Sequence, residues 1–538
     1  MIRRAFRLPL SLPLSSNAQL ALTMGVALGL RLLWLAYTDF TYEDAHITFR
    51  FARNIAAGQG FVYNAGDPIY GTTTPLMTLL LSGWMMIFPD AVITGARLID
   101  LLSAMGALSL IWSILDRIGI TDARRFVAVM LLVLSDKLWI KDTGGMETPL
   151  VIFLMMAVWY AAIRGWHIRA GVLAGLLLLA RIDAIVWLVT LMIVFWSIAR
   201  RPPLRSTLAA GLVYLPWFLF ATFYFGSPVP YTITAKVLSY QIGLPPIEDR
   251  LLMVFKWMAP VTLPREWDAG SVVVAGVSIY LAVWGVWRAR SIKATWPLPL
   301  FGVFYLAYLA FSGATFANRY FVPVLWIVLI LMGLGLGSIW DRLLTQRSWP
   351  ASSRAVRGDA DGEQQRYARL SALRRFGVGL GALACCAGLW LGYQQADQMR
   401  DVQTYNNGTL KEIGLWLNRN SPPDATVLLE PLGYAGFYSD RLMIDVVGLV
   451  SPRIVFERER GRNDWCSLIE ATRPHYVIAH CDDALGWLDR REESCAFFGS
   501  AYERAITFNP LAFDPVTGNP PRSLARAACY EIWGSAER

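Results

Sequence analysis

Charge is scarce in this sequence. Of its 538 residues only 17% are charged and 55% are hydrophobic, whereas about one quarter of the residues of a soluble domain are charged. The mean hydropathy is +0.42, and several apolar runs approach the roughly 20 residues that a helix needs to cross a bilayer. The composition excludes an ordinary soluble domain and predicts a polytopic α-helical membrane protein.

Recognisable motifs for nucleotide and metal chemistry are also missing. The sequence has no Walker A pattern, no Gly-x-Gly-x-x-Gly after a strand and no His-Glu-x-x-His. It has only four histidines, which argues against a multi-histidine metal site. Among them, His46 alone lies beside the acidic residues that are considered below.

Cysteine is sparse, and the positions of the six cysteines divide them into two groups. Cys385 and Cys386 lie inside an apolar run. The other four lie in the polar C-terminal region: Cys466, Cys481, Cys495 and Cys529. An even number there is typical of two disulfide bonds in an oxidising compartment, and three pairings are open. The alternative is four free thiols in a cytosolic tail.

The net charge of +9 does not indicate a nucleic-acid partner, because the basic residues gather in short loops between apolar runs. Such clusters mark the cytoplasmic side of a membrane protein. The clusters are Arg117 with Arg124 and Arg125, Arg164 with Arg169, Arg200 with Arg201 and Arg205, Arg288 with Arg290 and Lys293, and the stretch from Arg342 to Arg375. The first apolar run follows Arg3, Arg4 and Arg7 and lacks a clear cleavage site, so we expect a retained anchor with a cytoplasmic N-terminus.

This sidedness predicts eleven transmembrane helices, with the N-terminus inside and the C-terminus outside. They are expected near residues 18–38, 93–116, 125–141, 147–164, 169–182, 183–200, 206–226, 269–288, 296–313, 320–341 and 376–395. The apolar run at 74–88 is not counted, because a crossing there would place every later basic cluster outside. We expect it to be an interfacial or re-entrant helix on the outer side, with Pro75 in its first turn.

The sequence divides into a transmembrane domain, residues 1–395, and an extracytoplasmic domain, residues 396–538. The inner loop 342–375 is rich in charge and is expected to be flexible. Short apolar runs in the tail predict strands at 425–430, 442–447 and 475–479 and helices at 410–417 and 466–471, as in a small α/β domain. Asn407-Gly408-Thr409 fits a glycosylation sequon, which is a weak pattern.

The first outer loop, residues 39–92, begins with two adjacent carboxylates, Glu43 and Asp44, where the first helix should leave the bilayer. Ionisable residues next to lipid are costly and are therefore functional candidates. Asp44, Phe51 and Ile55 recur at helical spacing, which predicts an amphipathic helix in the membrane interface. The alternative is that the carboxylates only cap this helix, since acidic residues favour the first turn.

Further ionisable and aromatic residues are expected on the same side of the membrane. These candidates are Lys137, Lys141, Asp142, Glu147, Arg181, Asp183, Tyr231, Thr232, Lys236, Asn318, Arg319 and Tyr320. Each has a structural alternative, such as an ion pair between Arg181 and Asp183, or a Lys236 that extends to a lipid headgroup. Together they predict one polar cavity that opens outward, with carboxylates to handle a proton and cations to hold a phosphate.

The first outer loop, YEDAHITFRFARNIAAGQGFVYNAGDPIYGTTTPL, resembles that of the GT-C superfamily of polyprenyl-phosphate-sugar-dependent glycosyltransferases. It is most similar to the branch that includes the mycobacterial terminal arabinofuranosyltransferase. The similarity continues in GMETPL at 145–150, ARIDA at 180–184, PVPYTITAK at 228–236, NRYFVPVL at 318–325 and GYAGFYSDRLMIDVVGLVSP at 433–452. Two positions depart from the family pattern: Glu43 replaces the commoner aspartate, and Ile182 replaces the usual proline.

The resemblance implies a membrane glycosyltransferase in which Asp44 is the base for the acceptor hydroxyl, with Glu43 beside it. The donor would be a sugar, such as arabinofuranose, on a polyprenyl phosphate, and the acceptor a cell-envelope glycan or lipid-linked glycan that the tail helps to hold. Residues expected to bind the donor phosphate are Lys236 and Arg319, with Arg181 and Lys141 behind them; those expected to bind substrate are His46, Glu147, Asp183, Tyr231 and Tyr320. No cofactor is demanded, and a divalent metal ion is left open.

The implied location is the bacterial inner membrane, with the C-terminal domain in the periplasm. A second hypothesis is a lipid or ion-coupled transporter or flippase that uses the same outward-facing charges. Such a protein should have inverted internal repeats with paired broken helices, and the sequence shows no such symmetry.

Overall fold

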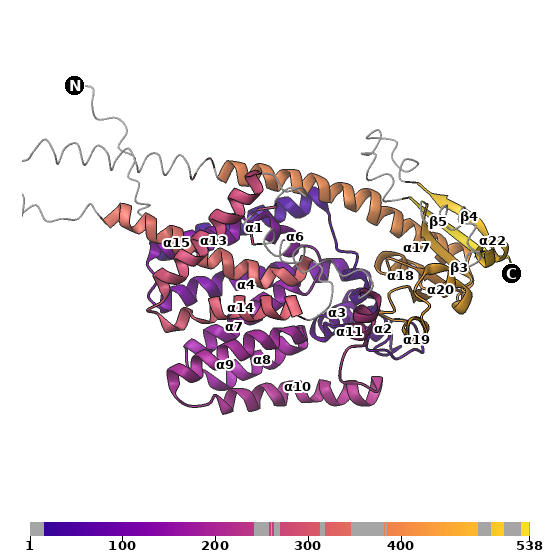
Figure 1. The fold of residues 1–538 in the computed structure, drawn as a ribbon, viewed down its shortest axis with the longest axis horizontal. Helices are drawn as coiled ribbons and strands as arrows, with labels where there is room; N and C mark the ends of the chain where they lie inside the picture. The colour runs from indigo at the N-terminus through magenta and orange to yellow at the C-terminus, as the bar shows by residue number, and fades with distance from the viewer. Residues whose placement is uncertain are drawn as a thin grey trace, which may run out of the picture.

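The computed structural model describes residues 15–240, 258–259, 261–262, 269–311, 318–345, 381, 383, 385–481, 496–509 and 529–536. Within these ranges the protein is an elongated bundle of helices with a small α/β domain at one end (Figure 1). The segment that follows the first helix lies between these two parts. It carries Glu43 and Asp44, the two adjacent carboxylates at the start of the first outer loop.

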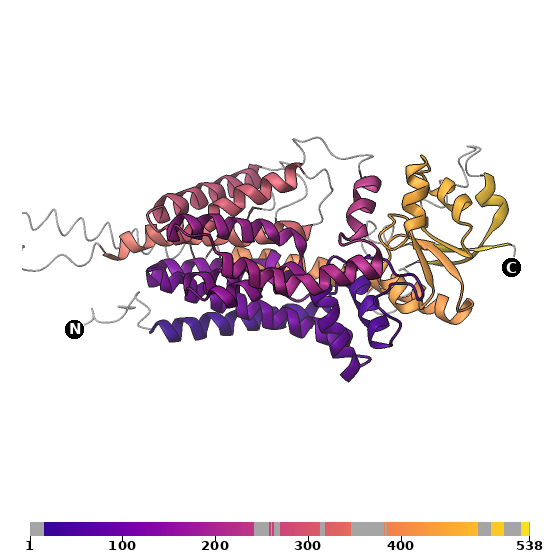
Figure 2. The ribbon, with the colours of Figure 1, turned by 90° about the horizontal axis from the view of Figure 1, so that it is seen from below.

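The helices of the bundle run roughly along the long axis of the molecule (Figures 1 and 2). They are α1 (Ser16–Thr38), α4 (Val92–Arg117), α5 (Asp122–Leu134), α7 (Thr148–Ile163), α8 (His167–Ala180), α9 (Ile185–Ala199), α10 (Leu204–Phe225), α13 (Ala269–Ala289), α14 (Pro297–Phe311) and α15 (Val322–Thr345). Shorter elements are α2 (Ala45–Ala56), α3 (Pro75–Ile87), α6 (Asp136–Lys141), α11 (Tyr231–Tyr240), η1 (Ile182–Ala184), η2 (Lys293–Thr295) and η3 (Asn318–Phe321). Of these, α2, α3 and α11 lie where the bundle meets the α/β domain.

Seven helices within the described ranges are long and apolar enough to cross a membrane. They cover residues 16–38, 92–117, 182–199, 204–225, 272–289, 293–311 and 319–341, and each coincides with an expected span. The spans expected at 147–164 and 169–182 form the shorter helices α7 and α8, of 16 and 14 residues. The span expected at 376–395 begins outside the described residues, and 385–401 are helical. The polytopic helical architecture is confirmed.

The prediction of one continuous helix through α5 and α6 is wrong. Ser135 is extended (φ −73°, ψ 113°) and separates the two helices. Side chains compensate for the break, because the Trp139 indole N–H donates to the Val133 carbonyl (2.7 Å). Asp136 accepts a hydrogen bond from the Thr262 backbone N–H (3.2 Å). The polar residues Ser135, Asp136 and Lys137 mark this break in the sequence, although the expected span runs through them, and in the structure all three are buried.

Different loops lie at the two ends of the bundle. At one end, Arg125 at the start of α5 donates to Ser16 at the start of α1 (2.9 Å), and Arg124 pairs with Asp341 of α15 (2.7 Å). The first outer loop and the α/β domain lie at the opposite end (Figure 2). The basic turn between α4 and α5 is therefore remote from the carboxylates after α1, as the charge pattern predicts.

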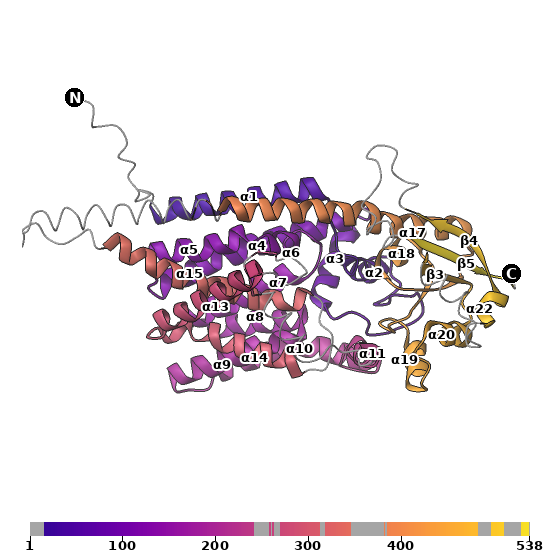
Figure 3. The same ribbon diagram turned by 45° about the horizontal axis from the view of Figure 1, so that its top comes forward.

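Helix α2 forms where the spacing of Phe51 and Ile55 predicts it, but its surroundings differ from the expectation. It packs against α3 on one side and against the α/β domain on the other (Figure 3). None of its twelve residues is exposed. An amphipathic helix in a membrane interface should present its polar face to water, whereas this polar face is covered by protein.

The α/β domain contains a five-stranded sheet in the order β2-β1-β3-β5-β4. Its elements are η5 (Val402–Asn407, a π-helix), α17 (Gly408–Asn420), β1 (Thr426–Leu429), α18 (Gly433–Ser439), β2 (Leu442–Asp445), α19 (Pro452–Glu459), α20 (Trp465–Thr472), β3 (Tyr476–His480), α22 (Ala496–Ala501), β4 (Tyr502–Phe508) and β5 (Tyr530–Ser535). β2, β1 and β3 are parallel, and β5 and β4 continue the sheet antiparallel. The three predicted strands and two predicted helices are confirmed, and β4 and β5 are additional.

Both faces of the inner strand β1 are buried, so its apolar residues do not alternate with polar ones. Val427 packs in the same core as Phe51 and Tyr63 from the first outer loop. Leu428 points to the other face, where it packs with Ile454 and Leu468. The first face of the sheet is therefore completed by the segment that follows α1, and this contact fixes the α/β domain on the bundle.

Arg50 of α2 strengthens this junction from a buried position. Its guanidinium donates to the backbone carbonyls of Tyr63 (2.9 Å), Gly436 (2.6 Å) and Arg441 (2.6 Å). A buried guanidinium requires such partners, because desolvating a charge without hydrogen bonds is costly. Gly436 has no side chain, which is needed here because a Cβ atom would clash with the Tyr63 hydroxyl.

Two expectations for the tail can be compared with the structure. Asn407 of the sequon is only 2% exposed, and its side-chain amide donates to the Thr41 carbonyl (3.0 Å), so it is not placed to carry a glycan. Cys481 is bonded to Cys529, and Cys466 is also disulfide-bonded. Cys495 lies outside the described residues.

Candidate functional site

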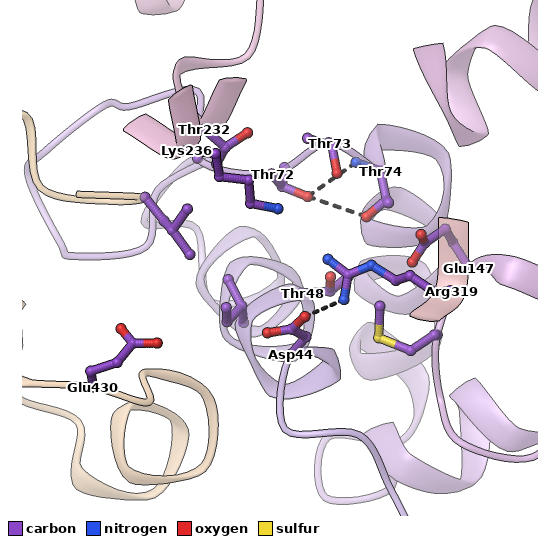
Figure 4. Close-up of a pocket in the computed structure, with 14 residues that line it drawn as sticks. Asp44, Thr48, Thr72, Thr73, Thr74, Glu147, Thr232, Lys236, Arg319 and Glu430 are labelled. Atoms are coloured by element: carbon purple, nitrogen blue, oxygen red, sulfur yellow. Dashed lines mark hydrogen bonds and ion pairs between the residues drawn. The ribbon is translucent and has the colours of Figure 1, made fainter. Parts of the chain in front are cut away.

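A polar cavity of about 340 Å³ lies between the bundle and the α/β domain. Figure 4 shows the side chains that line it. They are Asp44, Ile47, Thr48, Gly71, Thr72, Thr73, Thr74, Met146, Glu147, Thr232, Lys236, Arg319, Glu430 and Leu449. These residues come from the first outer loop, the starts of α3 and α7, helix α11, η3 and the α/β domain, so the cavity exists only in the assembled fold.

Asp44 is the residue that precedes α2, and its side chain is 42% exposed to the cavity. It makes no capping hydrogen bond to the helix, so the interpretation of Asp44 as only a cap is not supported. Instead it forms an ion pair with Arg319. Burial alone would raise the pKa of Asp44, but the charge and hydrogen bond of Arg319, together with Lys236 and Lys141, hold this pKa below its ordinary value.

Positive charge gathers next to Asp44, in a cationic wall formed by Arg319 and Lys236. The side chains of Arg319 and Lys236 both extend into the cavity (Figure 4). The centroid of the Tyr320 ring lies 5.9 Å from the Lys236 ammonium, 5.5 Å from the Arg319 guanidinium and 4.4 Å from the Arg181 guanidinium. An aromatic face attracts nearby cations, so Tyr320 supports the cationic wall without itself lining the cavity.

Hydroxyl groups lie next to these cations. The Thr72 and Thr74 hydroxyls are 3.2 Å apart, and the Thr72 hydroxyl accepts a hydrogen bond from the Thr74 backbone N–H (3.3 Å). Among the described residues, the buried Thr232 hydroxyl has no hydrogen-bond partner. α3 begins at Pro75, and the start of a helix favours negative charge. Sequence reasoning included Thr232 but missed Thr72, Thr73 and Thr74 as site residues, although three threonines before a helix-starting proline were a usable signal.

A buried network of ion pairs and hydrogen bonds adjoins the cavity at Glu147. Arg181 donates to both carboxylate oxygens of Asp183 (2.9 and 2.6 Å) and to Glu147 (3.4 Å). The Tyr305 hydroxyl donates to the same Asp183 (2.6 Å). Of this group only Glu147 lines the cavity. The side chains of Arg181 and Asp183, expected to bind phosphate and substrate, form an ion pair with each other and do not line the cavity.

Lys141 also lies outside the cavity wall. Its ammonium donates to the Tyr42 hydroxyl (2.6 Å) and lies 4.4 Å from the centroid of the Tyr42 ring. The Tyr42 backbone N–H donates to the Gly144 carbonyl (2.9 Å). Lys141 therefore contributes positive charge near Asp44. Its side chain also holds Tyr42, which lies two residues before Asp44.

Three other candidates are not among the residues that line the cavity. Glu43 accepts a hydrogen bond from the Gly433 backbone N–H in the α/β domain. His46 is fully buried and stacks on Tyr434 (centroids 3.7 Å apart), and burial lowers its pKa to about 3. Tyr231 donates to the Pro452 carbonyl (3.4 Å). The positions of His46 and Tyr231 do not agree with the expected contact with substrate, and Glu43 joins the two parts of the protein.

Glu430 was not expected in the site. It directly follows β1 and lies on the side of the cavity formed by the α/β domain (Figure 4). No group of three or more His, Cys, Asp and Glu residues in the described part of the chain is arranged to hold a metal ion. The site therefore combines an ion pair of Asp44 with Arg319, a second cation and several hydroxyls, with Glu430 apart from them on the side of the α/β domain.

Comparisons with known proteins give two results for the sequence. Residues 394–533 match the family described as Domain of unknown function (DUF8728), which covers the α/β domain and the end of the helix before it. None of the curated proteins matches the sequence.

Several solved structures have a similar fold. ArnT from Cupriavidus metallidurans bound to undecaprenyl phosphate has 14% identity and a TM-score of 0.56, over 97% of this chain and 99% of that chain. The Archaeoglobus fulgidus oligosaccharyltransferase, tethered with an acceptor peptide containing the NVT sequon, has 13% identity and a TM-score of 0.57, over 91% of this chain and 72% of that chain. The mycobacterial arabinofuranosyltransferase AftD has 16% identity and a TM-score of 0.50, over 98% of this chain and 40% of that chain.

These three proteins are GT-C glycosyltransferases. The similarity extends over both the helical bundle and the α/β domain of this chain, because each alignment covers at least 91% of it. This chain therefore has the fold of the GT-C glycosyltransferases, as the resemblance of its motifs predicts.

Proposed function

We propose that this chain is an integral membrane glycosyltransferase that moves a sugar from a polyprenyl phosphate to a hydroxyl group of a cell-envelope glycan. The observation that carries the proposal is the pairing of Asp44 with Arg319 in a cavity that also contains Lys236. A transfer of this kind needs a base for the acceptor and cations for the departing phosphate. The fold supports it, since the similar ArnT structure contains undecaprenyl phosphate.

The cationic wall is suited to the donor phosphate. Arg319 and Lys236 supply two positive charges, and Thr72 and Thr232 supply hydroxyl groups beside them. Charged hydrogen bonds to phosphate are stronger than neutral ones. A phosphate that leaves as an anion needs no proton, so stabilisation of its charge is the main contribution these residues make.

Asp44 is suited to the acceptor side of the reaction. It takes the proton of the acceptor hydroxyl as the acceptor oxygen bonds to the anomeric carbon of the sugar, and the bond from that carbon to the phosphate oxygen breaks. A general base contributes a factor of about 10² to 10⁴ in rate. Arriving phosphate competes for Arg319, so donor binding weakens the ion pair and makes the Asp44 carboxylate more basic.

The membrane arrangement follows from the same proposal. We assign residues 1–395 to the catalytic membrane domain and 396–538 to an extracytoplasmic domain in the periplasm of a bacterium, with the N-terminus in the cytoplasm. The cavity then opens at the outer leaflet. The similarity to arabinofuranosyltransferase AftD supports a pentofuranose such as arabinofuranose as the sugar.

A donor panel tests this proposal. The purified protein is incubated with polyprenyl-phosphate-linked arabinofuranose, mannose and glucose, each labelled in the sugar, together with a neutral octyl glycoside as acceptor. Release of polyprenyl phosphate together with labelled octyl disaccharide from one donor supports the proposal. Movement of intact donor across the bilayer of reconstituted vesicles, without cleavage, would instead support a flippase.

A further inference from the structure

Glu430 occupies a special position in the α/β domain. It directly follows β1, and β1 is parallel to its neighbours β2 and β3. Leu449, which follows β2 in the chain, lines the same cavity. Ligands of open α/β sheets bind outside the carboxyl ends of parallel strands, so the edge of the sheet that faces the cavity is the edge at which a ligand is expected.

The Glu430 side chain has unused hydrogen-bonding capacity. Its Oε2 atom is buried, and among the described residues it has no hydrogen-bond partner. Buried polar atoms in native proteins are almost always paired, and an exception calls for an explanation. Because the side chain lines the cavity, a group of a bound ligand can supply the missing partner.

The charges around Glu430 indicate the kind of ligand group. Burial raises the pKa of Glu430 to about 8, Asp445 and Asp44 act in the same direction, and Arg458 opposes them. The nearby Glu43 is also affected by the charge of Glu430. At neutral pH the carboxyl group is therefore mostly protonated, and a protonated carboxyl can both donate and accept a hydrogen bond.

A neutral sugar hydroxyl fits this group better than a phosphate does. The described ion pairs include none between Glu430 and a basic residue, whereas Arg319 and Lys236 stand on the far wall. A hydroxyl is both a donor and an acceptor, as is a protonated carboxyl. The two walls therefore suit different substrates, with phosphate at the cations and a polyhydroxylated glycan at Glu430.

We propose that Glu430 binds the acceptor, using its carboxyl group to hold one hydroxyl of a neutral glycan so that a neighbouring hydroxyl faces Asp44. This inference rests on the proposed glycosyltransferase activity and deepens it, because it assigns one residue of the α/β domain to acceptor recognition. It also explains why the cavity lies between the two parts of the protein.

The test compares E430A, E430Q and E470A with the wild type, using octyl α-D-arabinofuranoside as acceptor and the donor that the wild type accepts. Glu470 is exposed on α20 and serves as the matched control. E430A should raise the acceptor KM about tenfold, as for one lost hydrogen bond, while the donor KM stays within about twofold. E430Q, which keeps a donor and an acceptor, should restore most of the acceptor affinity.

The pH dependence gives a second readout. The acceptor KM of the wild type should rise as the pH increases through about 8, where Glu430 loses its proton, and that of E430Q should not. An unchanged acceptor KM in E430A, or a change in the donor KM alone, would overturn the assignment of Glu430 while leaving the proposed function intact. Absence of transfer by the wild type with every donor would overturn the proposed function and the assignment together.

Discussion

Arg319 of η3 and Asp44 at the start of α2 are 275 residues apart in the chain and form an ion pair in the wall of the cavity. The pair joins the two chemical requirements of the proposed reaction, a base and a cation. It also keeps each group charged before substrate arrives, because an opposite charge nearby favours the ionised form.

Replacing Arg319 by methionine should change the pH dependence of the reaction. Arg319 lowers the pKa of Asp44, and Asp44 must be ionised to act as a base. In R319M this pKa should rise, so activity should be lost at a higher pH as the solution is acidified. The measurement is kcat/KM against pH for R319M and R319K. If the kcat/KM of R319M falls at the same acidic pH as that of the wild type, the result would contradict the lowering of the Asp44 pKa by Arg319.

Replacing Lys236 by methionine should weaken donor binding specifically. Lys236 lines the cavity and takes part in none of the described salt bridges, so its loss should leave the stability of the protein unchanged. The donor KM should rise about 10- to 100-fold, as expected for one charged hydrogen bond to phosphate. Equilibrium binding of undecaprenyl phosphate to K236M and K236R measures this directly. Equal binding by K236M and wild type would remove Lys236 from the phosphate site.

Replacing Arg181 by methionine should affect stability more than chemistry. Arg181 and Glu147 have side chains that are each only 5% exposed, and Asp183 is bonded to both Arg181 and Tyr305. Removing one partner from a buried ion pair costs about 3–5 kcal/mol, because the remaining charge is left uncompensated. The melting temperature in detergent should be clearly lower for R181M than for the wild type, and partly restored in R181M/D183N. A melting temperature equal to that of the wild type would argue that the network is not structural.

Replacing Glu43 by glutamine should reduce the sensitivity of stability to alkaline pH. Burial raises the pKa of Glu43 well above its ordinary value of 4.5, and the charges of Asp44 and Glu430 add to this. A carboxyl with a raised folded-state pKa stabilises the fold below the unfolded-state value and loses that contribution as the pH rises. E43Q cannot ionise and should unfold less readily than the wild type at alkaline pH. Identical pH profiles of the melting temperature would contradict a protonated Glu43.

The sequence predicted most of the bundle because its signals are local. Apolar run length and basic clusters define spans without knowledge of tertiary contacts. The division between α5 and α6 was not predicted, because the span expected at 125–141 was drawn through the polar residues Ser135, Asp136 and Lys137. The surroundings of α2 also differ from the expectation. Its amphipathic pattern predicts a polar face, but the pattern is the same whether water or protein covers that face.

The candidate site was only partly accessible from the sequence. Asp44, Lys236 and Arg319 could be listed together because the expected topology puts them on one side of the membrane. The position of Glu430 depends on the docking of the α/β domain, which rests on contacts such as Arg50 with the Arg441 carbonyl. Those contacts join segments almost 400 residues apart and leave no periodic signal in either segment.

The proposed base is tested most directly by the turnover of D44N under saturating donor and acceptor. Asparagine keeps the size of the side chain but cannot take a proton, so release of polyprenyl phosphate should fall by a factor of about 10² to 10⁴ while the melting temperature stays close to that of the wild type. A folded D44N protein that releases polyprenyl phosphate at a rate within about twofold of the wild type would contradict Asp44 as the base, since loss of a general base is far more costly.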